Sequence, residues 1–370
     1  MAQKTNVMLV IDHWGFGGAQ RVVRGLLNKW DNRDIKLFCY ALRKSSNELE
    51  QDNDKEYFFS SKHKSKYSVL PFFELKKLIG NNNIGILHLH LTKAIVFGIL
   101  LKTLYYRNIK IIVHEHGKAF KNNWLYNLFL RCVKTRVHLF IAVSEATKRK
   151  LIENAGIPGK KIKTLYDFVD LEHFNSQKIK INRLEERGNL GLNESDFVIG
   201  FAGRLSKVKG CQYLIKAVPH INIPGIKVLI AGDGAERAEL EKLAEDLNIK
   251  DKITFLGYFN KMSNFYHIID ILVVPSRFES FGIVVIEAQA SGIPVVASDV
   301  GALNELIEDG ENGLLFDFAN ERDLAEKVEL IEKGKDLREK LIKNGLHSVT
   351  KYSLETYLES LALIYGDETN

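Results

Sequence analysis

Short apolar runs rich in β-branched residues alternate with amphipathic segments along the chain, and this alternation limits the fold more than any other feature. Such runs are typical of buried strands, while the segments between them have helical spacing. Strands that are joined through helices pair in parallel, and helices then cover both faces of the sheet. We therefore predict doubly wound α/β domains. The expected strands span 6–11, 35–42, 84–90, 110–116, 139–144, 197–203, 227–234, 252–258, 270–276 and 293–299.

The length of the chain predicts two such domains. It has 370 residues, and a domain averages about 150. A polar stretch without apolar periodicity, 175–196, marks the join. We expect a first Rossmann-like domain over 1–182, a second over 183–350 and an amphipathic helix over 351–370. Because ligands of open α/β sheets bind beyond the carboxyl ends of the strands, a cleft between two facing domains is the expected site.

Cysteine usage and hydropathy exclude several classes of protein. Cys39, Cys132 and Cys211 are far apart and lack the spacing of a metal or redox motif, so a reducing, cytoplasmic compartment is expected. Of the two longest apolar segments, 94–106 is too short to span a bilayer and 124–143 carries three cations. The apolar run near the start is too short for a signal peptide. We expect no membrane span.

The charge of the chain is unevenly distributed. Residues 1–180 hold 31 lysines and arginines against 15 aspartates and glutamates, whereas the rest holds 21 against 31. A basic first half suits an anionic partner such as a membrane surface or a diphosphate-linked acceptor. Surface lysines that keep the protein in solution would give the same count. We expect the basic first domain to contact an anionic membrane peripherally, and we expect no nucleic-acid partner.

Two cations follow the strand expected at 197–203. Arg204 and Lys209 lie in the loop before a helix, where a planar fork and a point charge suit a diphosphate. Gly210 at the helix start leaves room for backbone N–H groups to approach an anion. An ordinary solvated loop between strand and helix is the alternative interpretation.

Two glutamates stand eight positions apart in "RFESFGIVVIEAQASG", residues 277–292. Glu279 lies in the loop after a strand, and the backbone of Ser280, Phe281 and Gly282 leads into the next helix, a natural seat for phosphate. Glu287 falls one to two turns into that helix. Since carboxylates accept well from sugar hydroxyls, one ligand with a phosphate core and hydroxyl-rich rings would use both kinds of group. A nucleotide sugar is such a ligand.

Two further glycine loops follow strands. Gly232 and Gly234 in "LIAGDG" lack a third glycine and an acidic ribose clamp, so they predict a tight turn rather than a nicotinamide site. Gly17 and Gly18 precede the first helix and open a second helix start to an anion. A flexible glycine loop explains the first-helix pattern equally well.

These motifs together resemble those of the retaining family 4 glycosyltransferases of the GT-B type (glycosyl transferases group 1). The resemblance rests on "GGAQRVV", "AVSEATKRKLI", "VDLEHF", "FAGRLSKVKG", "LIAGDG", "ITFLGY", "VVPSRFESFGIVVIEAQASGIPVVASDVGALNELI" and "DGENGLLF" in this order, and it covers nearly the whole chain. It implies two Rossmann-like domains facing across a cleft, with the C-terminal helix crossing back to the first. The chain departs from the family pattern at Gln20, where glutamate is usual, and at Asp167 and Phe168, where Asn-Gly is frequent.

The resemblance also implies roles for individual residues. Arg204 and Lys209 match the cations that hold the donor diphosphate, Glu279 lies near the donor sugar, and Glu287 accepts from the ribose. His116, or else His114, matches the histidine beside the reaction centre. The catalytic set is thus His116, Lys209, Arg204 and Glu279. The donor-binding set is Gly17, Gly18, Arg204, Lys209, Gly232, Leu256, Tyr258, Glu279, Ser280, Phe281, Gly282, Ile283 and Glu287.

The implied reaction is retaining transfer of a sugar from a nucleotide-sugar donor, UDP-linked by family preference, to a glycan or lipid-linked glycan in surface polysaccharide or glycoconjugate synthesis. The leaving diphosphate helps to deprotonate the acceptor, while the cations stabilise the negative charge of the diphosphate. No D-x-D motif follows a strand in the second half, so we expect no metal and no other cofactor. Two alternatives stay open: a nucleotide-sugar epimerase of the same fold, which needs no acceptor, and a catalytically silent subunit of a glycan-assembly complex.

Overall fold

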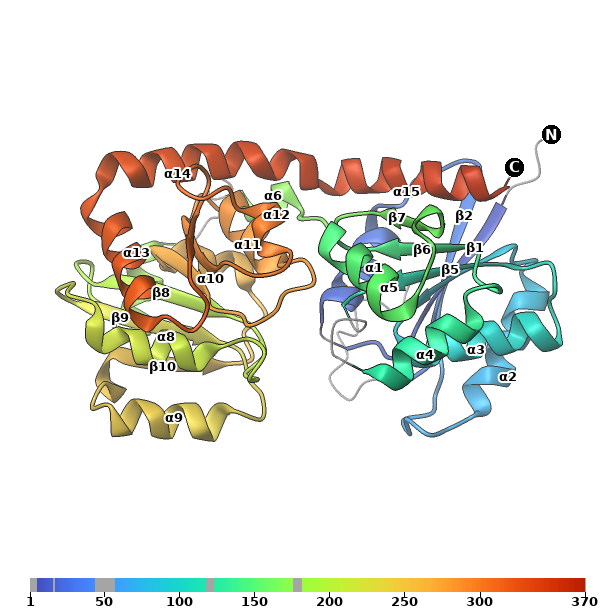
Figure 1. Ribbon diagram of the computed structural model, residues 1–370, viewed down its shortest axis with the longest axis horizontal. Helices are drawn as coiled ribbons and strands as arrows, with labels where there is room; N and C mark the ends of the chain where they lie inside the picture. Colours follow the sequence, from blue (N-terminus) through green and yellow to red (C-terminus); the bar gives the residue numbers. More distant parts are fainter. Residues whose placement is uncertain (1–4, 16, 44–56, 118–122, 176–181, 370) are drawn as a thin grey trace. The chain divides into compact units, whose positions relative to one another are not determined.

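The computed structural model describes residues 5–15, 17–43, 57–117, 123–175 and 182–369. The chain forms two compact units (Figure 1). Unit 1 consists of Met1–Asp167 with Glu355–Asn370, and unit 2 consists of Phe168–Leu354. Each is a parallel sheet covered by helices, so the predicted α/β class with two doubly wound domains is confirmed. The arrangement of the units across a cleft stays a prediction.

Unit 1 contains a seven-stranded parallel sheet of order β3-β2-β1-β4-β5-β6-β7. Alternate residues of its central strands belong to one apolar cluster with α2, α3, α4 and α5, so these helices cover one face. The other face carries α1 and α15. The strands are β1 Thr5–Ile11, β2 Ile35–Ala41, β3 Phe58–Ser60, β4 Ile86–His90, β5 Lys110–Glu115, β6 Leu139–Ala142 and β7 Ile162–Thr164. The helices are α1 Gly18–Lys29, α2 Leu70–Asn81, α3 Thr92–Leu104, α4 Trp124–Val133, α5 Glu145–Ala155 and α15 Leu354–Thr369.

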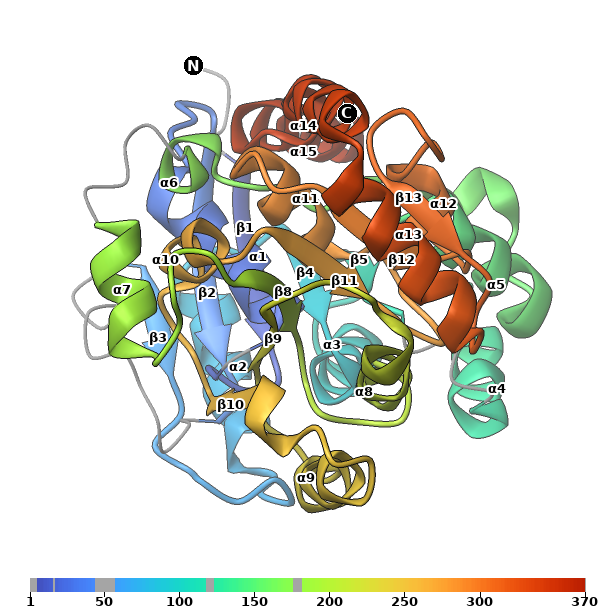
Figure 2. The same ribbon diagram turned by 90° about the vertical axis from the view of Figure 1, so that its left-hand side faces the viewer.

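Unit 2 contains a six-stranded parallel sheet of order β10-β9-β8-β11-β12-β13. Helices α8, α9 and α13 share an apolar cluster with one face of it, while α10 and α11 pack on the other (Figure 2). The strands are β8 Phe197–Ala202, β9 Ile226–Ala231, β10 Ile253–Gly257, β11 Ile271–Val274, β12 Val295–Ser298 and β13 Leu314–Phe316. The helices are α6 Leu171–Phe174, α7 Arg183–Asn189, α8 Cys211–Ala217, α9 Arg237–Asp246, α10 Met262–Ile268, α11 Ile283–Ala290, α12 Leu303–Leu306, α13 Glu321–Lys333 and α14 Lys335–Ser348.

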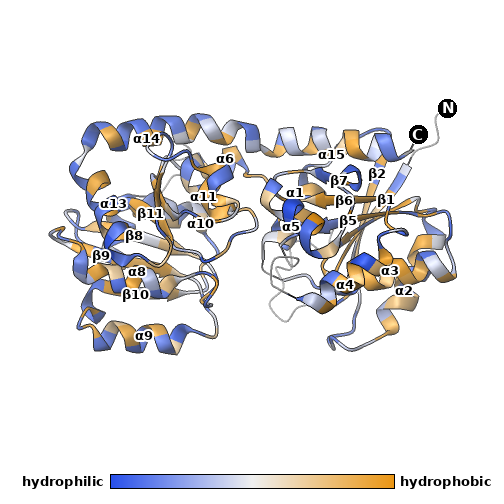
Figure 3. Ribbon diagram, in the orientation of Figure 1, coloured by the Kyte–Doolittle hydropathy of each residue, from blue (hydrophilic) through white to orange (hydrophobic). Residues whose placement is uncertain are grey.

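Burial on both faces explains why these strands read as continuous apolar runs (Figure 3). All four residues of β11 and of β12 are buried, and β8 has one half-buried residue in six. The ten strands expected from the sequence are present. The structure adds β3, β7 and β13, which have three residues each and are too short for a periodic signal.

The C-terminal helix α15 packs on unit 1. The hydroxyl of Tyr365 lies 2.6 Å from Nδ1 of His88 on β4, and Asp367 forms an ion pair of 2.7 Å with Lys163 on β7. The helix begins at Leu354, slightly later than the predicted boundary at 351. Within the described residues, no helix combines the length and apolar character needed to cross a bilayer.

The structural division between the units lies earlier than the predicted boundary at 182. Unit 1 ends at Asp167, and the following segment belongs to unit 2. Val169 forms a parallel β-bridge with Ser353, and the ring of Phe174 packs edge-on against Tyr266 with centroids 5.8 Å apart. These contacts place the segment after Asp167 in the core of unit 2.

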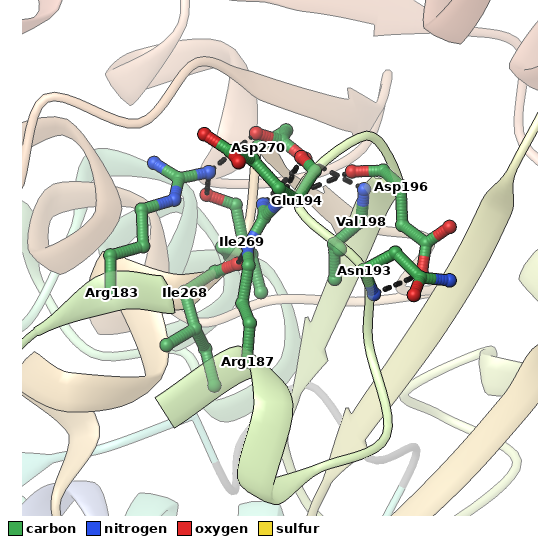
Figure 4. Close-up of polar contacts among 9 residues, drawn as sticks. All are labelled: Arg183, Arg187, Asn193, Glu194, Asp196, Val198, Ile268, Ile269 and Asp270. Atoms are coloured by element: carbon green, nitrogen blue, oxygen red, sulfur yellow. Dashed lines mark hydrogen bonds and ion pairs between the residues drawn. The ribbon is translucent and has the colours of Figure 1, made fainter. Parts of the chain in front are cut away.

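Part of the polar stretch predicted as the join also folds onto unit 2, as helix α7 (Figure 4). Arg187 is 3% exposed and bonds to the Asp270 carboxylate at 2.8 Å, while Arg183 bonds to the other oxygen at 2.6 Å. The backbone N–H of Val198 donates to the same carboxylate at 2.7 Å. The helix is therefore attached through guanidinium groups rather than an apolar stripe, which is why the stretch lacks apolar periodicity.

Candidate functional site

The candidate residues of unit 2 follow the carboxyl ends of adjacent strands. Arg204 and Lys209 lie between β8 and α8, and Glu279 lies between β11 and α11. Gly232 follows β9, and Tyr258 follows β10. Because these strands are parallel and neighbouring, their loops meet at one edge of the sheet.

Glycines allow these loops to pack backbone against backbone. A Cβ on Gly232 would lie 1.8 Å from the carbonyl oxygen of Gly203, and one on Gly234 would lie 2.2 Å from that of Leu205. Neither position has room for a side chain. The "LIAGDG" glycines thus serve the tight approach of two loops, as the sequence predicts for a turn.

Gly210 sets the position of the basic loop in the same way. It caps α8 in the left-handed conformation, with φ of 68°. A Cβ there would lie 1.9 Å from the carbonyl oxygen of Pro275, in the loop that carries Glu279. Only glycine permits this approach, which brings the loops after β8 and β11 into contact.

Lys209 and Glu279 form an ion pair across this contact. The Glu279 side chain is 7% exposed and that of Lys209 is 31% exposed. The hydroxyl of Ser276 donates to the same oxygen of Glu279 at 3.0 Å, and the hydroxyl of Ser298 donates to the carbonyl oxygen of Ser276 at 2.5 Å. The carboxylate is therefore fixed by a serine as well as by the cation, while the ammonium keeps donors for a ligand.

The sequence assigned Lys209 and Glu279 to different parts of a ligand, and the structure brings them together. Their separation of 70 positions leaves no local pattern from which to predict the pair. Ser276 was not predicted either. Its position between a strand and the first glutamate could have identified it as a hydrogen-bond donor to that glutamate.

Glu287 lies in a second, deeper polar group. It is 1% exposed, and the hydroxyl of Tyr266 donates to its Oε2 at 2.9 Å. Tyr266 comes from α10 and is fully buried. The sequence analysis missed this residue, although a tyrosine in an otherwise apolar segment calls for a polar partner. The Tyr266 bond fixes the orientation of the second glutamate.

The segment that enters α11 offers backbone rather than side chains. The ring of Phe281 is 1% exposed and packs edge-on against Tyr352 with centroids 5.6 Å apart. Gly282 caps the helix with φ of 107°, and Ile283 is its first residue. With Ser280, these residues form a helix start, and the inward ring of Phe281 leaves only its backbone for a ligand.

The remaining candidates of unit 2 differ in exposure. Tyr258 is 53% exposed, and Leu256 is half-buried within β10. Arg204 is exposed, and in the described part of the chain no carboxylate forms an ion pair with it. Its guanidinium is thus open to an anionic ligand, whereas Lys209 would have to share its charge with Glu279.

In unit 1 the predicted glycine loop forms the start of α1. Gly17 caps the helix, Gly18 is its first residue, and both are exposed. A Cβ on Gly17 would lie 2.4 Å from the amide oxygen of Gln20. Gln20 is buried, with its amide nitrogen 3.2 Å from Nε2 of His13. Gln20, at the position where the family usually has glutamate, therefore places an amide beneath the glycine loop.

The two candidate histidines of unit 1 differ in exposure. His116 follows β5 and is half-buried, whereas His114 is 1% exposed. Their rings stack with centroids 4.4 Å apart, and Nε2 of His116 lies 3.0 Å from Nδ1 of His90. Burial lowers the pKa of His116 to about 3. His116 is therefore neutral at pH 7 and of the two is the one open to solvent.

Asp167 is a buried acid beside these histidines. It is 4% exposed, and burial raises its pKa to about 8, although the positive charge of Arg21 acts in the opposite direction. The carboxyl is thus protonated at neutral pH. One of its oxygens lies within 4.8 Å of ring nitrogens of His114 and His116.

Comparison with known proteins finds two family models that together cover most of the chain. Glycosyltransferase Family 4 matches residues 16–173, and Glycosyl transferases group 1 matches residues 182–348. An uncharacterized glycosyltransferase of Methanocaldococcus jannaschii is 33% identical over 229 residues, 61% of this chain and 59% of that protein. The match thus spans about three fifths of that relative's length.

Two further similarities extend over more of the chain. The N-acetyl-alpha-D-glucosaminyl L-malate synthase of Bacillus anthracis is 25% identical over 307 residues, covering 81% of this chain and 79% of that protein. The crystal structure of Anabaena HepE in complex with UDP and glucose superposes with a TM-score of 0.86 at 20% identity, covering 98% of this chain and 100% of that one. The second similarity is one of fold.

Proposed function

This chain belongs to the group 1 glycosyltransferases of family 4, with the GT-B fold, and from that premise we propose that it transfers a sugar from a UDP-linked donor, with retention, to a glycan or lipid-linked glycan acceptor. The reaction would serve surface polysaccharide or glycoconjugate synthesis. The choice of UDP is supported by the Anabaena HepE structure, which is a complex with UDP and glucose.

The observation that carries the proposal is the Lys209–Glu279 pair where the loops after β8 and β11 meet. A donor sugar offers hydroxyl groups to the Glu279 carboxylate, and its diphosphate offers negative charge to Lys209. The ion pair holds both groups ready, so binding replaces one polar contact by others rather than ordering two flexible side chains. Arg204, exposed on the same loop, supplies the planar fork for a phosphate.

We assign the chemical step to electrostatic stabilisation of the leaving diphosphate. Negative charge grows on the phosphate oxygens as the bond to the sugar breaks, and Lys209, Arg204 and the start of α11 stabilise it. The acceptor hydroxyl loses its proton to the departing phosphate on the same face of the sugar. Neutral His116 would orient the acceptor. No step uses a metal ion at the diphosphate, so activity should survive removal of magnesium and manganese.

The direct test is binding and hydrolysis of a panel of UDP-, GDP- and ADP-sugars without acceptor. We expect saturable binding of a UDP-sugar that Glu287→Ala weakens, because Glu287 accepts from the ribose. Glu305→Ala, a carboxylate on the nearby α12, is the matched control and should leave binding unchanged. Absence of binding to every nucleotide sugar would overturn the proposal, whereas donor conversion without any acceptor would indicate an epimerase.

For the acceptor we propose a substrate at an anionic membrane surface. Large apolar side chains are exposed on α2, α3 and α4, which share one face of the unit 1 sheet. Phe73 is 55% exposed, Leu104 61% and Trp124 68%. Four exposed cations lie in or next to α2 and α3 in the sequence. They are Lys64, Lys66, Lys77 and Arg107. Exposed apolar groups and exposed cations on the same unit suit the interface of an anionic bilayer.

Sedimentation with vesicles tests this surface. We expect the protein to pellet with vesicles that contain anionic lipid and to stay in solution with neutral ones. Trp124→Ser should reduce the bound fraction, whereas Leu330→Ser, which removes a 51% exposed leucine from α13 of unit 2, should not. Equal behaviour with both vesicle types would remove the support for a membrane-borne acceptor.

A further inference from the structure

Four histidines lie on the face of the unit 1 sheet that carries α15. His88 and His90 alternate with leucines along β4, and His114 lies directly opposite His90 on β5. The intervening Leu87, Leu89 and Val113 point to the apolar cluster on the other face. The imidazoles therefore form a ladder, which His116 extends past the end of β5. His88 and His90 are fully buried and His114 is 1% exposed.

Two of these rings already have a hydrogen-bond partner at Nδ1. Nδ1 of His88 lies 2.6 Å from the hydroxyl of Tyr365, and Nδ1 of His90 lies 3.0 Å from Nε2 of His116. When Nδ1 carries the proton in both rings, it donates to these partners, and Nε2 is left as a bare lone pair. The contacts with Tyr365 and His116 are thus compatible with the tautomer that a metal ligand needs.

The other ring nitrogens of His88, His90 and His114 have no hydrogen-bond partner among the described residues. Nε2 of His88, Nε2 of His90 and both ring nitrogens of His114 are buried without a hydrogen bond. A buried polar atom left in that state costs about 1–3 kcal/mol, and native proteins keep few of them. Three neighbouring imidazoles that all leave nitrogens unsatisfied call for a common ligand.

We propose that His88, His90 and His114 bind one divalent transition-metal ion, zinc by preference. One ring nitrogen of each lies within 4.8 Å of one from both others. Imidazole nitrogen is a preferred zinc ligand. A tetrahedral site with Zn–N bonds of about 2.0–2.1 Å brings such nitrogens to about 3.4 Å from one another. Rotation of the rings about their side-chain bonds would supply this approach while the strands keep their register.

A buried carboxyl, that of Asp167, lies beside the site. Its Oδ1 has no hydrogen bond within the described residues, and it faces His114 and His116. The ion would join β4 to β5, and through Tyr365 it would tie α15 to the sheet. It would serve unit 1, whereas the proposed diphosphate contacts Lys209 and Arg204 belong to unit 2, so the site is compatible with metal-free transfer.

The test uses the untagged full chain, stripped with a chelator and then supplied with zinc chloride. We expect one zinc per chain after gel filtration, by elemental analysis, and a higher midpoint of thermal unfolding. Trp14, Trp30 and Trp124 are all the tryptophans of the chain and all belong to unit 1, so tryptophan fluorescence follows that unit alone. Cobalt in place of zinc should give visible absorption bands of a four-coordinate site.

His114→Asn and His88→Asn should each lower the bound zinc at least tenfold and abolish the cobalt bands. His63→Asn, which alters a partly exposed histidine of unit 1 beside Glu74, is the matched control and should bind like the wild type. Tryptophan fluorescence of the metal-free variants shows whether unit 1 remains folded. Wild type that binds no zinc, or folded His114→Asn that binds as much as wild type, overturns the proposal.

Discussion

The two units have the same architecture but treat buried polar groups at the ends of their strands in opposite ways. In unit 2 two acidic groups near strand ends are paired with cations: Glu279 with Lys209, and Asp270 with Arg187. In unit 1 the buried histidines His88, His90 and His114 keep ring nitrogens that lack hydrogen bonds within the described residues. The Lys209–Glu279 pair can exchange one partner for a ligand, whereas lone pairs without a hydrogen bond suit a cation. The comparison separates a site for an anionic donor from one for a metal.

The largest effect should come from breaking a buried charge pair in unit 2. Arg187→Leu leaves Asp270 with Arg183, which is 38% exposed, as its remaining cation. Removing one partner of a buried pair costs about 3–5 kcal/mol. We expect unit 2 to unfold at lower denaturant by circular dichroism, while tryptophan fluorescence, which reports unit 1, stays near its wild-type midpoint. Arg183→Leu is the control and should cost less stability. If Arg183→Leu lowered the stability of unit 2 as much as Arg187→Leu, the buried Arg187 would not be the main partner of Asp270.

The next effect should appear in catalysis. Lys209→Ala removes a charge that stabilises the leaving diphosphate and should lower kcat by about 10²-fold at saturating donor. Lys207→Ala changes an exposed lysine of the same loop and should leave kcat near wild type. Turnover of Lys209→Ala at the wild-type rate would show that the pair with Glu279 is structural, and the contrast between the units would then lose its functional meaning.

In the metal-free protein, the stability of unit 1 should depend on pH differently above and below pH 6.5. Burial lowers the pKa of His88 and of His116 to about 3, from an ordinary value of 6.5, and burial lowers the pKa of His90 and His114 as well. The stability that neutral histidines contribute is complete above pH 6.5 and is lost as pH falls toward the folded-state pKa. The slope is about 1.4 kcal/mol per pH unit for each histidine.

Asp167 acts in the opposite direction. Its pKa of about 8 means that its contribution is complete below its ordinary value of 3.8 and is lost as pH rises toward 8. Four histidines outweigh one acid below pH 6.5, so unit 1 should be most stable near pH 6.5 by tryptophan fluorescence. Asp167→Asn should remove the decline between pH 6.5 and 8 and keep the acid side. An unchanged alkaline side in that variant would remove Asp167 as its cause.

The sequence was sufficient for the sheets because their strands are long, apolar and separated by amphipathic helices. It also placed Lys209 and Glu279 in loops after strands. Their pairing was out of reach, since it depends on the close approach of Gly210 to the carbonyl oxygen of Pro275. That contact joins loops about 65 positions apart, and no local spacing encodes it.

The histidine cluster could in part have been predicted from the sequence. "ILHLH" and "IIVHEH" each place histidines at alternate positions of an apolar strand, which puts them on one face. Only the register between β4 and β5, which sets His90 opposite His114, turns two local patterns into one cluster. Tyr266 was missed for the related reason that its partner Glu287 lies on another helix.

The smallest effect should come from Tyr266→Phe, which removes the hydroxyl that orients Glu287. Phenylalanine fills the same space, so the change isolates one hydrogen bond, worth about 1 kcal/mol, or about fivefold in donor KM. We expect KM for the donor to rise while kcat stays the same, because the ribose contact exists in both ground and transition states. Tyr213→Phe, on α8, is the matched control. If kcat fell instead, the pre-paired groups of unit 2 would be coupled to one another, and donor binding could not be separated from the chemistry at Lys209.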